Sequence, residues 1–399
     1  MKNNNLIIGE IKELAKEYFD EIVLCRRHLH QYPELSKKET ETANFICLKL
    51  RDMGIEYKKD VGGHGIYGFV EGKNPQKKCI SLRADMDALP IQEETSLPYK
   101  SKKDGIMHAC GHDIHMASLL GTIKILSKMR DKFEGRVMFI FQPSEESYPG
   151  GAISMLNDGI FDEVLPSEIF AYHTTPEMDC GYIGMKEGKY MASTDEIYID
   201  VIGKGGHGAT PDLNIDPILA ASHVVVALQS IVSRNANPTM PTTFSLGRFI
   251  ADGRTNVIPN HVKMEGIIRT FDENWRKECH KLIERIAKQT AQAYGAEAKV
   301  FVDAGYPFVY NNPDTTKKAL SLAKEYFGED KVLELESRMT AEDFSYFAQR
   351  TSGCYFRIGT RKEGQPITNL HTNNFDVDEK CIEYAMGISS YFAISSLKS

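Results

Sequence analysis

One change of pattern, near residue 190, constrains the fold of this 399-residue chain more than any other feature of its sequence. Before that point, segments with helical periodicity alternate with short apolar segments that have the length of buried strands. Such alternation predicts an α/β fold, with a mostly parallel sheet covered by helices on both faces. The helices are predicted at 7–30, 40–53, 114–129 and 151–157, and the strands at 66–70, 80–82, 137–141 and 168–173.

A different order of elements follows between residues 190 and 303. The pattern predicts strand, helix, strand, strand, helix and strand, at 196–203, 217–233, 242–250, 262–271, 274–294 and 297–303. That is the order of a ferredoxin-like unit, which can fold as a layer of its own. The earlier alternation then returns, with elements at 313–327, 341–349, 354–359 and 378–397. We therefore expect an α/β domain made of residues 1–189 and 304–399, with residues 190–303 inserted into it.

Composition argues against several classes of function. The formal charge of −7 and the lack of a basic stretch oppose a nucleic-acid partner, because phosphate contacts need clustered Lys and Arg. No run approaches the roughly 18 apolar residues of a membrane span, and the first residues lack the apolar core of a signal peptide. The eight cysteines form no CxxC pair, which is typical of reduced thiols in the cytoplasm. We expect a cytoplasmic protein that acts on a small molecule, with no nucleic-acid or membrane partner.

The segment HACGHDIHM, residues 108–116, concentrates imidazoles and a thiol. Cys110 and His112 flank a single glycine just before a predicted helix, so both side chains can reach one point. Thiolate and imidazole are both ligands that zinc accepts. Taken alone, the pair is equally well explained by a buried Cys beside a structural His, because buried Cys is common and His often binds a local carbonyl.

Two adjacent carboxylates follow the strand predicted at 137–141, in the segment FIFQPSEES. Glu145 and Glu146 repel each other unless a cation or different surroundings stabilise them. Neighbouring residues of an extended chain point to opposite sides. One carboxylate could therefore bind a metal while the other faces a substrate. Two solvated loop glutamates are the alternative.

Two further histidines stand where an α/β sheet gathers its ligands. His173 closes the strand predicted at 168–173, and His371 lies in the polar loop TNLHTNNF. Either residue by itself would be taken for an ordinary loop His. The candidate metal ligands are then five residues: Cys110, His112, Glu146, His173 and His371. Five ligands are too many for one open catalytic zinc and suit two cations that share a bridging ligand such as a thiolate.

A set of motifs along the chain resembles a known family. In order, the motifs are RRHLHQYPELS, SLRADMDALPIQEE, MHACGHDIHMA, FQPSEES, GKGGHGATP, NVIP, IIRTF, TAEDFSYF and LHTNNF. The set, which spans about residues 20–395, is similar to the amidohydrolase branch of the M20 metallopeptidases. That branch includes hippurate hydrolases, N-acyl-amino-acid amidohydrolases and N-acetyldiaminopimelate deacetylases.

The resemblance implies a dinuclear-metal hydrolase domain with an inserted lid domain that usually forms a homodimer. It implies that Cys110 is the bridging thiolate and that the other four candidates complete the ligand set of two divalent metal ions per subunit. In other branches a metal-binding His stands where this sequence has Asp85, so the expected ligand set is the one that contains Cys. Nitrogen, oxygen and sulfur ligands together suit Zn or Mn, with Co or Ni as alternatives.

The resemblance also implies catalytic roles. Glu145 is then the general base, which takes a proton from water and returns it to the leaving nitrogen. His207, in the inserted unit, is implied to lie near the scissile amide, in some members from the partner subunit, and to stabilise the oxyanion. Asp85 and Asp87 are expected to orient the ligand imidazoles.

The implied reaction is hydrolysis of the amide bond of an N-acyl-L-amino acid. This substrate carries a carboxylate, which Asn256 or Arg269 could bind, the arginine through a bidentate pair. Either residue could equally brace the inserted unit. Cleavage of dipeptides, or deacetylation of N-acetyldiaminopimelate, is the alternative within the family.

Two alternatives lie outside hydrolysis. Gly203, Gly205 and Gly208 have the spacing of a dinucleotide-binding fingerprint. However, Pro211 delays the helix, and no acidic residue ends a strand about 20 residues further on. A metal-storage or interaction protein would keep the ligands but would not need Glu145. Hydrolysis of an amide without added nucleotide would separate these possibilities.

Overall fold

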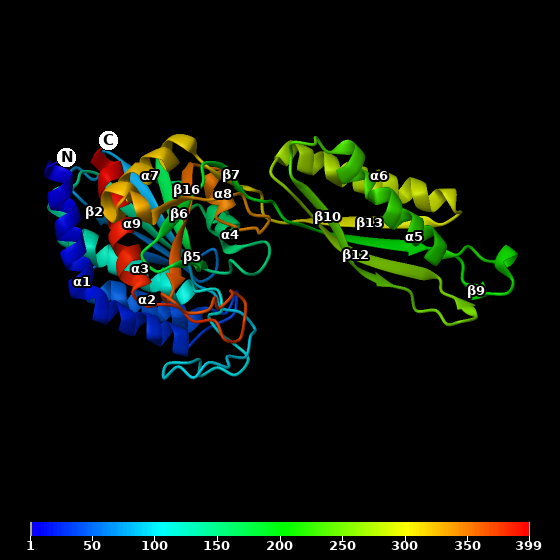
Figure 1. Ribbon diagram of the computed structural model, residues 1–399, viewed down its shortest axis with the longest axis horizontal. Helices are drawn as coiled ribbons and strands as arrows, with labels where there is room; N and C mark the ends of the chain where they lie inside the picture. The colour runs from blue at the N-terminus through cyan, green and yellow to red at the C-terminus, as the bar shows by residue number, and fades with distance from the viewer. Residues whose placement is uncertain (1, 399) are drawn as a thin grey trace. The chain divides into compact units, whose positions relative to one another are not determined.

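The computed structural model describes residues 2–398, and the chain divides into two compact units (Figure 1). Unit 1 takes in the described residues up to Gly188, together with Tyr310–Glu336 and the chain from Asp343 onward. Unit 2 consists of Lys189–Val309 and Ser337–Glu342. The first and last described segments, blue and red in Figure 1, therefore belong to unit 1.

Unit 1 is built on an eight-stranded sheet in the order β1-β2-β4-β3-β5-β16-β6-β15. The four central strands, β4, β3, β5 and β16, are parallel to one another. The predicted α/β fold with a mostly parallel sheet is confirmed. β3 and β4 are almost completely buried, which explains the continuous apolar run VMFIF of β4. The strands are β1 (Tyr57–Val61), β2 (Gly65–Glu71), β3 (Cys79–Asp85), β4 (Arg136–Gln142), β5 (Glu168–Asp179), β6 (Ile183–Met185), β15 (Val332–Glu334) and β16 (Ser352–Arg361).

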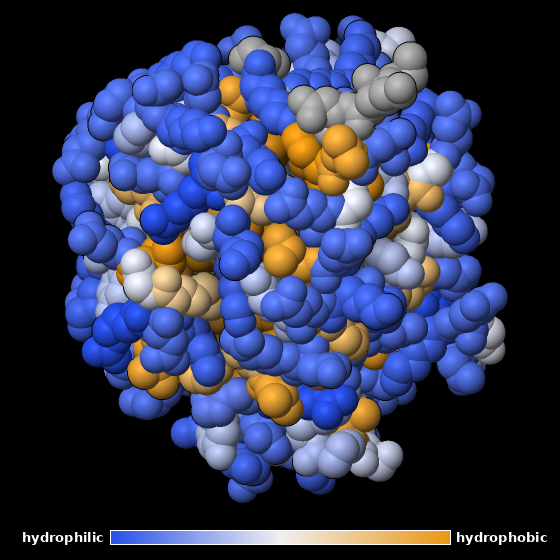
Figure 2. All heavy atoms as spheres, turned by 90° about the vertical axis from the view of Figure 1, so that its left-hand side faces the viewer, coloured by the Kyte–Doolittle hydropathy of each residue, from blue (hydrophilic) through white to orange (hydrophobic). Residues whose placement is uncertain are grey.

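Helices α1, α3 and α9 of unit 1 pack against one another. α3 is buried along almost its whole length, so its sequence is apolar at most positions, whereas α1 mixes apolar and charged residues. The surface on the α1 side is largely hydrophilic, with apolar side chains in small patches (Figure 2). Such scattered exposure is normal for a globular protein. The helices are α1 (Lys2–Gln31), α2 (Thr40–Asp52), α3 (His112–Lys128), α4 (Gly151–Asn157), α7 (Pro313–Phe327), α8 (Ser345–Ala348) and α9 (Cys381–Lys398).

Unit 2 contains a four-stranded antiparallel sheet in the order β10-β12-β8-β13. Its elements follow the chain as strand, helix, strand, strand, helix and strand, as the sequence pattern predicts. Along β8 the more buried residues alternate with more exposed ones, and the buried Ile197, Ile199 and Val201 join a core with residues of α5 and α6. The main elements are β8 (Asp195–Ile202), α5 (Pro217–Leu228), β10 (Thr242–Ile250), β12 (His261–Thr270), α6 (Glu273–Ala293) and β13 (Glu297–Ala304). Two short pairs are β9 (Gly206–His207) with β11 (Val257–Ile258), and β7 (Gly188–Met191) with β14 (Val309–Asn311).

Two predicted element boundaries are wrong. β5 runs on to Asp179, so His173 lies inside the strand and does not close it. The strand continues because the polar Thr174 and the residues after it pair with β16. The helix predicted at 341–349 is confined to α8, and Asp343, two residues before it, forms a buried ion pair with Arg83 (2.9 Å).

One helical stretch, Pro217–Asn235, is long and apolar enough to cross a membrane by length and composition alone, contrary to the sequence-based expectation. Core helices of soluble proteins pass the same test. α5, which begins this stretch, places Ala220, Ala221 and Val224 in the core of unit 2. Its apolar composition is therefore explained by packing within unit 2.

A buried ion pair at the start of β8 leads to a prediction about stability. The Asp195 carboxylate accepts hydrogen bonds from Arg276 Nε (2.9 and 3.0 Å), His280 Nε2 (2.6 Å) and the main-chain N–H of Gly305 (3.0 Å). Arg276→Ala would leave this buried carboxylate without its main cation, and is expected to lower the free energy of unfolding by about 3–5 kcal/mol. Urea unfolding followed by the fluorescence of Trp275, the single tryptophan and a unit 2 residue, measures this change.

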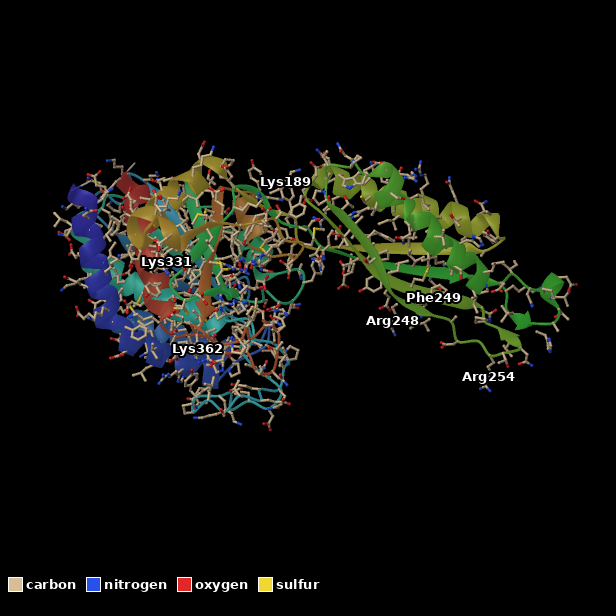
Figure 3. All side chains as sticks on the ribbon, in the orientation of Figure 1. Lys189, Arg248, Phe249, Arg254, Lys331 and Lys362 are labelled. Atoms are coloured by element: carbon tan, nitrogen blue, oxygen red, sulfur yellow. The ribbon has the colours of Figure 1, made fainter. Side chains whose placement is uncertain are left out.

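Arg248→Ala is the matched control, because Arg248, labelled in Figure 3, lies on the same sheet and forms an exposed ion pair with Glu265. Exposed pairs contribute about 0–1 kcal/mol, so this variant should unfold almost as the wild type does. Equal losses in the two variants would contradict the prediction. Burial raises the pKa of Asp195, but hydrogen bonds from His280 and Arg276 outweigh burial and lower it. The stabilisation is therefore present above the ordinary carboxyl pKa and is lost as the pH falls through the folded-state pKa.

Candidate metal centre

The turn before α3 brings Cys110 and His112 to one point. Gly111 caps the helix with a left-handed φ of 84°, and a Cβ there would approach Thr174 Oγ1 to 2.5 Å. Glycine is therefore required at this turn. The donor atoms of Cys110, His112 and His173 lie within 4.8 Å of one another, and all three residues are buried.

All five candidate ligands converge. Cys110 Sγ lies 3.2 Å from Nε2 of His173 and 3.2 Å from Nε2 of His371. Glu146 Oε1 lies 3.2 Å from His371 Nε2 and 4.0 Å from His112 Nε2. Cys110 thus belongs to two donor groups, one with His112 and His173, the other with Glu146 and His371. A thiolate shared by two groups is the arrangement that a bridging ligand requires.

Hydrogen bonds at Nδ1 orient two of the imidazoles. His112 Nδ1 donates to the main-chain carbonyl of Asp87 (2.9 Å), and His173 Nδ1 donates to the carbonyl of Thr174 (2.7 Å). The Nε2 atoms of both rings are then available as ligands. Within residues 2–398, His112 Nε2 and Glu146 Oε1 are buried with no hydrogen-bond partner, a deficit that a cation would remove. The residues present therefore fit a metal centre.

The charges around the cluster favour a cation. Burial lowers the pKa of His112, but Asp85 and Asp87 outweigh burial and raise it to about 10. Burial raises the pKa of Cys110 well above its ordinary value, and Glu146 raises it further. The thiol therefore keeps its proton beside these carboxylates unless a cation takes the place of that proton.

Glu145 lies beside the cluster. Its side chain is buried, and its carboxylate forms a group with donor atoms of His112 and Glu146. The two groups that contain Cys110 are complete without it. The main-chain N–H of Glu145 donates to Asp87 Oδ1 (3.0 Å), and that of Glu146 donates to Asp87 Oδ2 (2.9 Å). One carboxylate thus holds the backbone of both glutamates.

Asp85 serves different neighbours. Its Oδ1 accepts a hydrogen bond from His115 Nδ1 (2.6 Å), and its Oδ2 lies 3.8 Å from His112 Nε2. Burial raises the pKa of Asp85, but His112 and Arg83 outweigh burial and hold it well below its ordinary value. Asp85 therefore adds a full negative charge beside the cluster, and it fixes the imidazole of His115 directly.

Two residues that support the cluster were not predicted. Arg83 is buried between Asp85 (2.7 Å) and Asp343 (2.9 Å), and Thr174 supplies the carbonyl that orients His173. A cation within the short buried strand CISLRAD is the signal that could have identified Arg83, because buried arginines are rare without partners. The Thr174 hydroxyl also donates to the carbonyl of Cys110 (3.0 Å), but a threonine within a strand is common and carries no comparable signal.

The remaining predicted site residues belong to unit 2. His207 is exposed on β9, and the carbonyl of Asn256 accepts the N–H of Gly208 (3.0 Å), so His207 and Asn256 lie on neighbouring segments. Arg269 lies on β12 and is half-buried. Its Nη1 is buried and has no hydrogen-bond partner in the described part of the chain. Burial lowers the pKa of Arg269.

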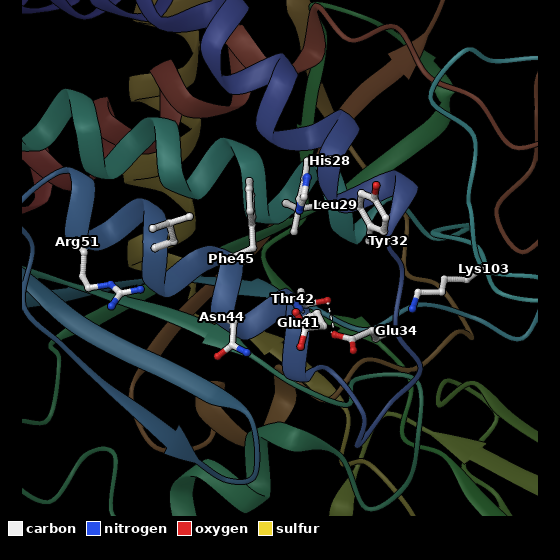
Figure 4. A pocket seen from close by; sticks show the side chains of 11 residues that line it. His28, Leu29, Tyr32, Glu34, Glu41, Thr42, Asn44, Phe45, Arg51 and Lys103 are labelled. Atoms are coloured by element: carbon white, nitrogen blue, oxygen red, sulfur yellow. Dashed lines mark hydrogen bonds between the residues drawn. The ribbon is translucent and has the colours of Figure 1, made fainter.

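A cavity of about 450 Å³ lies beside α1 and α2 (Figure 4). Its wall includes the stacked rings of His28 and Phe45, whose centroids are 4.1 Å apart, and the charged side chains of Arg51 and Lys103. Of the ligands described above, none contributes to this wall within residues 2–398. The metal-binding chemistry therefore belongs to the cluster around Cys110.

A comparison with protein families agrees with this geometry. The family described as Peptidase family M20/M25/M40 matches residues 81–394. The chain belongs to the M20 peptidase family. The resemblance to this family that the motifs indicate is thus confirmed.

Relatives of this M20 chain cover three quarters or more of its length. A hippurate hydrolase of Campylobacter jejuni is 39% identical over 394 residues, which cover 98% of this chain and 99% of the relative. An N-acyl-L-amino acid amidohydrolase of Geobacillus stearothermophilus is 42% identical over 302 residues, which cover 76% and 81% of the two chains. The solved structure of a dinuclear metal binding M20 peptidase of Bacillus subtilis matches with a TM-score of 0.83 at 34% identity, covering 96% and 99%.

These similarities establish the class of reaction. The M20 chain is a hydrolase that acts on amide bonds, as the sequence predicts. The dinuclear neighbour and the two donor groups that share Cys110 together support a centre for two metal ions.

Proposed function

We propose that this enzyme hydrolyses the amide bond of N-acyl-L-amino acids and releases a carboxylic acid and a free amino acid. The observation that carries the proposal is the convergence of the five candidate ligands on two groups that share Cys110, with the carboxylate of Glu145 beside them. Relatives named as a hippurate hydrolase and an N-acyl-L-amino acid amidohydrolase support an acyl amino acid as the substrate.

The two divalent cations are Zn or Mn in this proposal, with Co or Ni as alternatives. When bound, they supply a water that ionises near neutral pH, and they polarise the amide carbonyl. Glu145 accepts the proton of that water and delivers it to the leaving nitrogen. Its main chain is held by Asp87, which limits the directions in which its carboxylate can point. The residues that would hold the cations are Cys110, His112, Glu146, His173 and His371.

Unit 2 has roles of its own in the proposal. His207 donates a hydrogen bond to the oxyanion, and loss of such a donor raises the barrier by about 3 kcal/mol. Arg269 binds the substrate carboxylate, assisted by Asn256, because a guanidinium can pair with a carboxylate through two hydrogen bonds. A homodimer formed through unit 2 is also part of the proposal, since α5 exposes Leu219 and Val226, apolar side chains of the kind that interfaces cover.

A substrate panel tests this function. The enzyme is stripped with a chelator, reloaded with Zn, Mn, Co or Ni, and given N-acetyl and N-benzoyl amino acids, dipeptides and N-acetyldiaminopimelate. We expect the stripped enzyme to be inactive and at least one reloaded form to cleave N-acyl amino acids fastest. A preference for dipeptides or N-acetyldiaminopimelate would favour the alternative within the family, and inactivity of every reloaded form would refute the proposal. Sedimentation equilibrium of the same preparation measures the oligomeric state.

A further inference from the structure

We propose that Glu39 is a positioning residue for amide hydrolysis: it holds Ser144 in a left-handed conformation and thereby sets the direction of Glu145, the next residue. This inference rests on the proposed role of Glu145 as the group that moves the proton. Glu39 stands just before α2, 105 residues from Ser144 along the chain. Its bonds run to Ser144 and hold the turn from outside the ligand set.

The turn that carries Glu145 has an unusual backbone. Ser144 has a backbone φ of 55°, a conformation that residues other than glycine rarely adopt. Its main-chain N–H donates to Glu39 Oε1 (2.7 Å), and its hydroxyl donates to the same oxygen (3.0 Å). The hydroxyl also accepts the N–H of Lys37 (2.8 Å), another non-glycine residue with a positive φ, 68°. The two residues with positive φ, Lys37 and Ser144, are thus hydrogen-bonded to each other directly before Glu145.

Carboxylates hold three successive N–H groups of this turn. Glu39 accepts the N–H of Ser144, while Asp87 accepts those of Glu145 and Glu146. Such a set of bonds permits only one course of the backbone between the end of β4 and the two glutamates. The carboxylates of Glu145 and Glu146 can therefore keep different, fixed directions. That of Glu145 faces the proton it transfers, and that of Glu146 lies among the candidate ligands.

The local structure of α2 does not explain Glu39. Glu39 occupies the N-cap position, but among the described residues its side chain caps no N–H of the helix. In the first turn of α2 it is the side chain of Glu34 that accepts a main-chain N–H, the one of Thr42 (2.8 Å). The side chain of Glu39 is fully buried, and its Oε2 has no hydrogen-bond partner within residues 2–398. A buried carboxylate with one unsatisfied oxygen is costly, so the turn at Ser144 is the structural reason for its presence.

The main test compares Glu39→Met with Glu39→Gln in the metal-loaded enzyme. Both side chains have nearly the size of glutamate, but only glutamine keeps an oxygen that can accept from Ser144. We expect Glu39→Met to lower kcat about 10- to 100-fold, with KM and bound metal close to the wild type, because the proton-moving group is displaced. Glu39→Gln should keep most of the wild-type kcat. A wild-type kcat in Glu39→Met would overturn the inference.

Glu34→Met is the matched control. Glu34 accepts an N–H and an O–H from one residue, Thr42, just as Glu39 does from Ser144. Figure 4 shows the hydrogen bond between the side chains of Glu34 and Thr42. Its removal should lower the thermal midpoint and leave kcat unchanged, because it supports α2 and not the turn. If the two Met variants lose kcat in proportion to their loss of stability, Glu39 is merely structural and the inference fails.

Two further measurements separate this inference from the proposed function. Where Glu39→Met does not fold, Ser144→Val replaces it, since a β-branched residue disfavours a positive φ. A wild-type kcat in Ser144→Val would overturn the inference. Crystal structures of the variants show directly whether φ of residue 144 and the direction of Glu145 change. Inactivity of the wild type on the whole panel would refute the proposed function, whereas an unchanged turn in the Glu39→Met crystal would refute only the positioning role.

Discussion

Glu145→Gln is expected to lower kcat by about two to four orders of magnitude while the metal ions stay bound. The amide has the size of the carboxylate, so packing is kept, but it cannot accept a proton at neutral pH. The main-chain bond from residue 145 to Asp87 (3.0 Å) does not involve the changed atoms, so the turn should persist. Steady-state kinetics and metal analysis of the same protein samples measure both quantities.

Glu163→Gln is the control for this variant, because Glu163 is an exposed glutamate paired with Lys58. It should behave as the wild type does in both measurements. Two results would count against the role of Glu145: a nearly unchanged kcat, or a loss of metal that parallels the loss of activity. The second result would make Glu145 a ligand.

Cys110→Ala is expected to reduce the bound metal from about two ions per chain to fewer than one, and to abolish turnover. Cys110 Sγ lies 3.2 Å from Nε2 of both His173 and His371, so it connects the two donor groups. Loss of one shared atom removes a ligand from both groups at once. Isothermal titration with Zn or Mn, together with elemental analysis, measures the effect.

Cys354→Ala provides the comparison for Cys110→Ala. Cys354 is also a fully buried thiol, but it lies in the apolar core of unit 1. This variant should lose some stability, as other core truncations do, and keep its metal content. Retention of two tightly bound ions by Cys110→Ala would show that the thiolate is not a shared ligand.

Local sequence signals, taken together, indicated the five candidate ligands and Glu145, although each signal alone had an ordinary structural explanation. Cys110 and His112 stand in one short segment, and Glu145 follows a strand that sequence periodicity predicts. The mostly parallel sheet could be predicted as well, because helix and strand periodicity are properties of short segments. Convergence then follows from topology: parallel strands deliver their carboxyl ends to one edge of a sheet, whatever their separation in the chain.

Other features of the fold and the site depend on contacts between distant segments, and no local sequence pattern predicts them. The prediction that β5 ends at His173 was wrong because pairing with β16 extends the strand through polar residues. Arg83 donates to Asp343, which lies 260 residues further along the chain, and the pattern of charges in the sequence does not predict this partner. The oxygen of Asp87 that orients His112 is a main-chain carbonyl, which every residue type possesses.

The sequence by itself therefore determined the class of fold, the order of the main elements and the chemistry of the candidate ligands, because periodicity and side-chain type are local properties. Only the tertiary structure decided which ring nitrogens can bind a cation, and that a glutamate before α2 supports the backbone of Glu145. Those features depend on hydrogen bonds between distant segments and on a positive φ at a serine, which packing imposes against the preference of the residue.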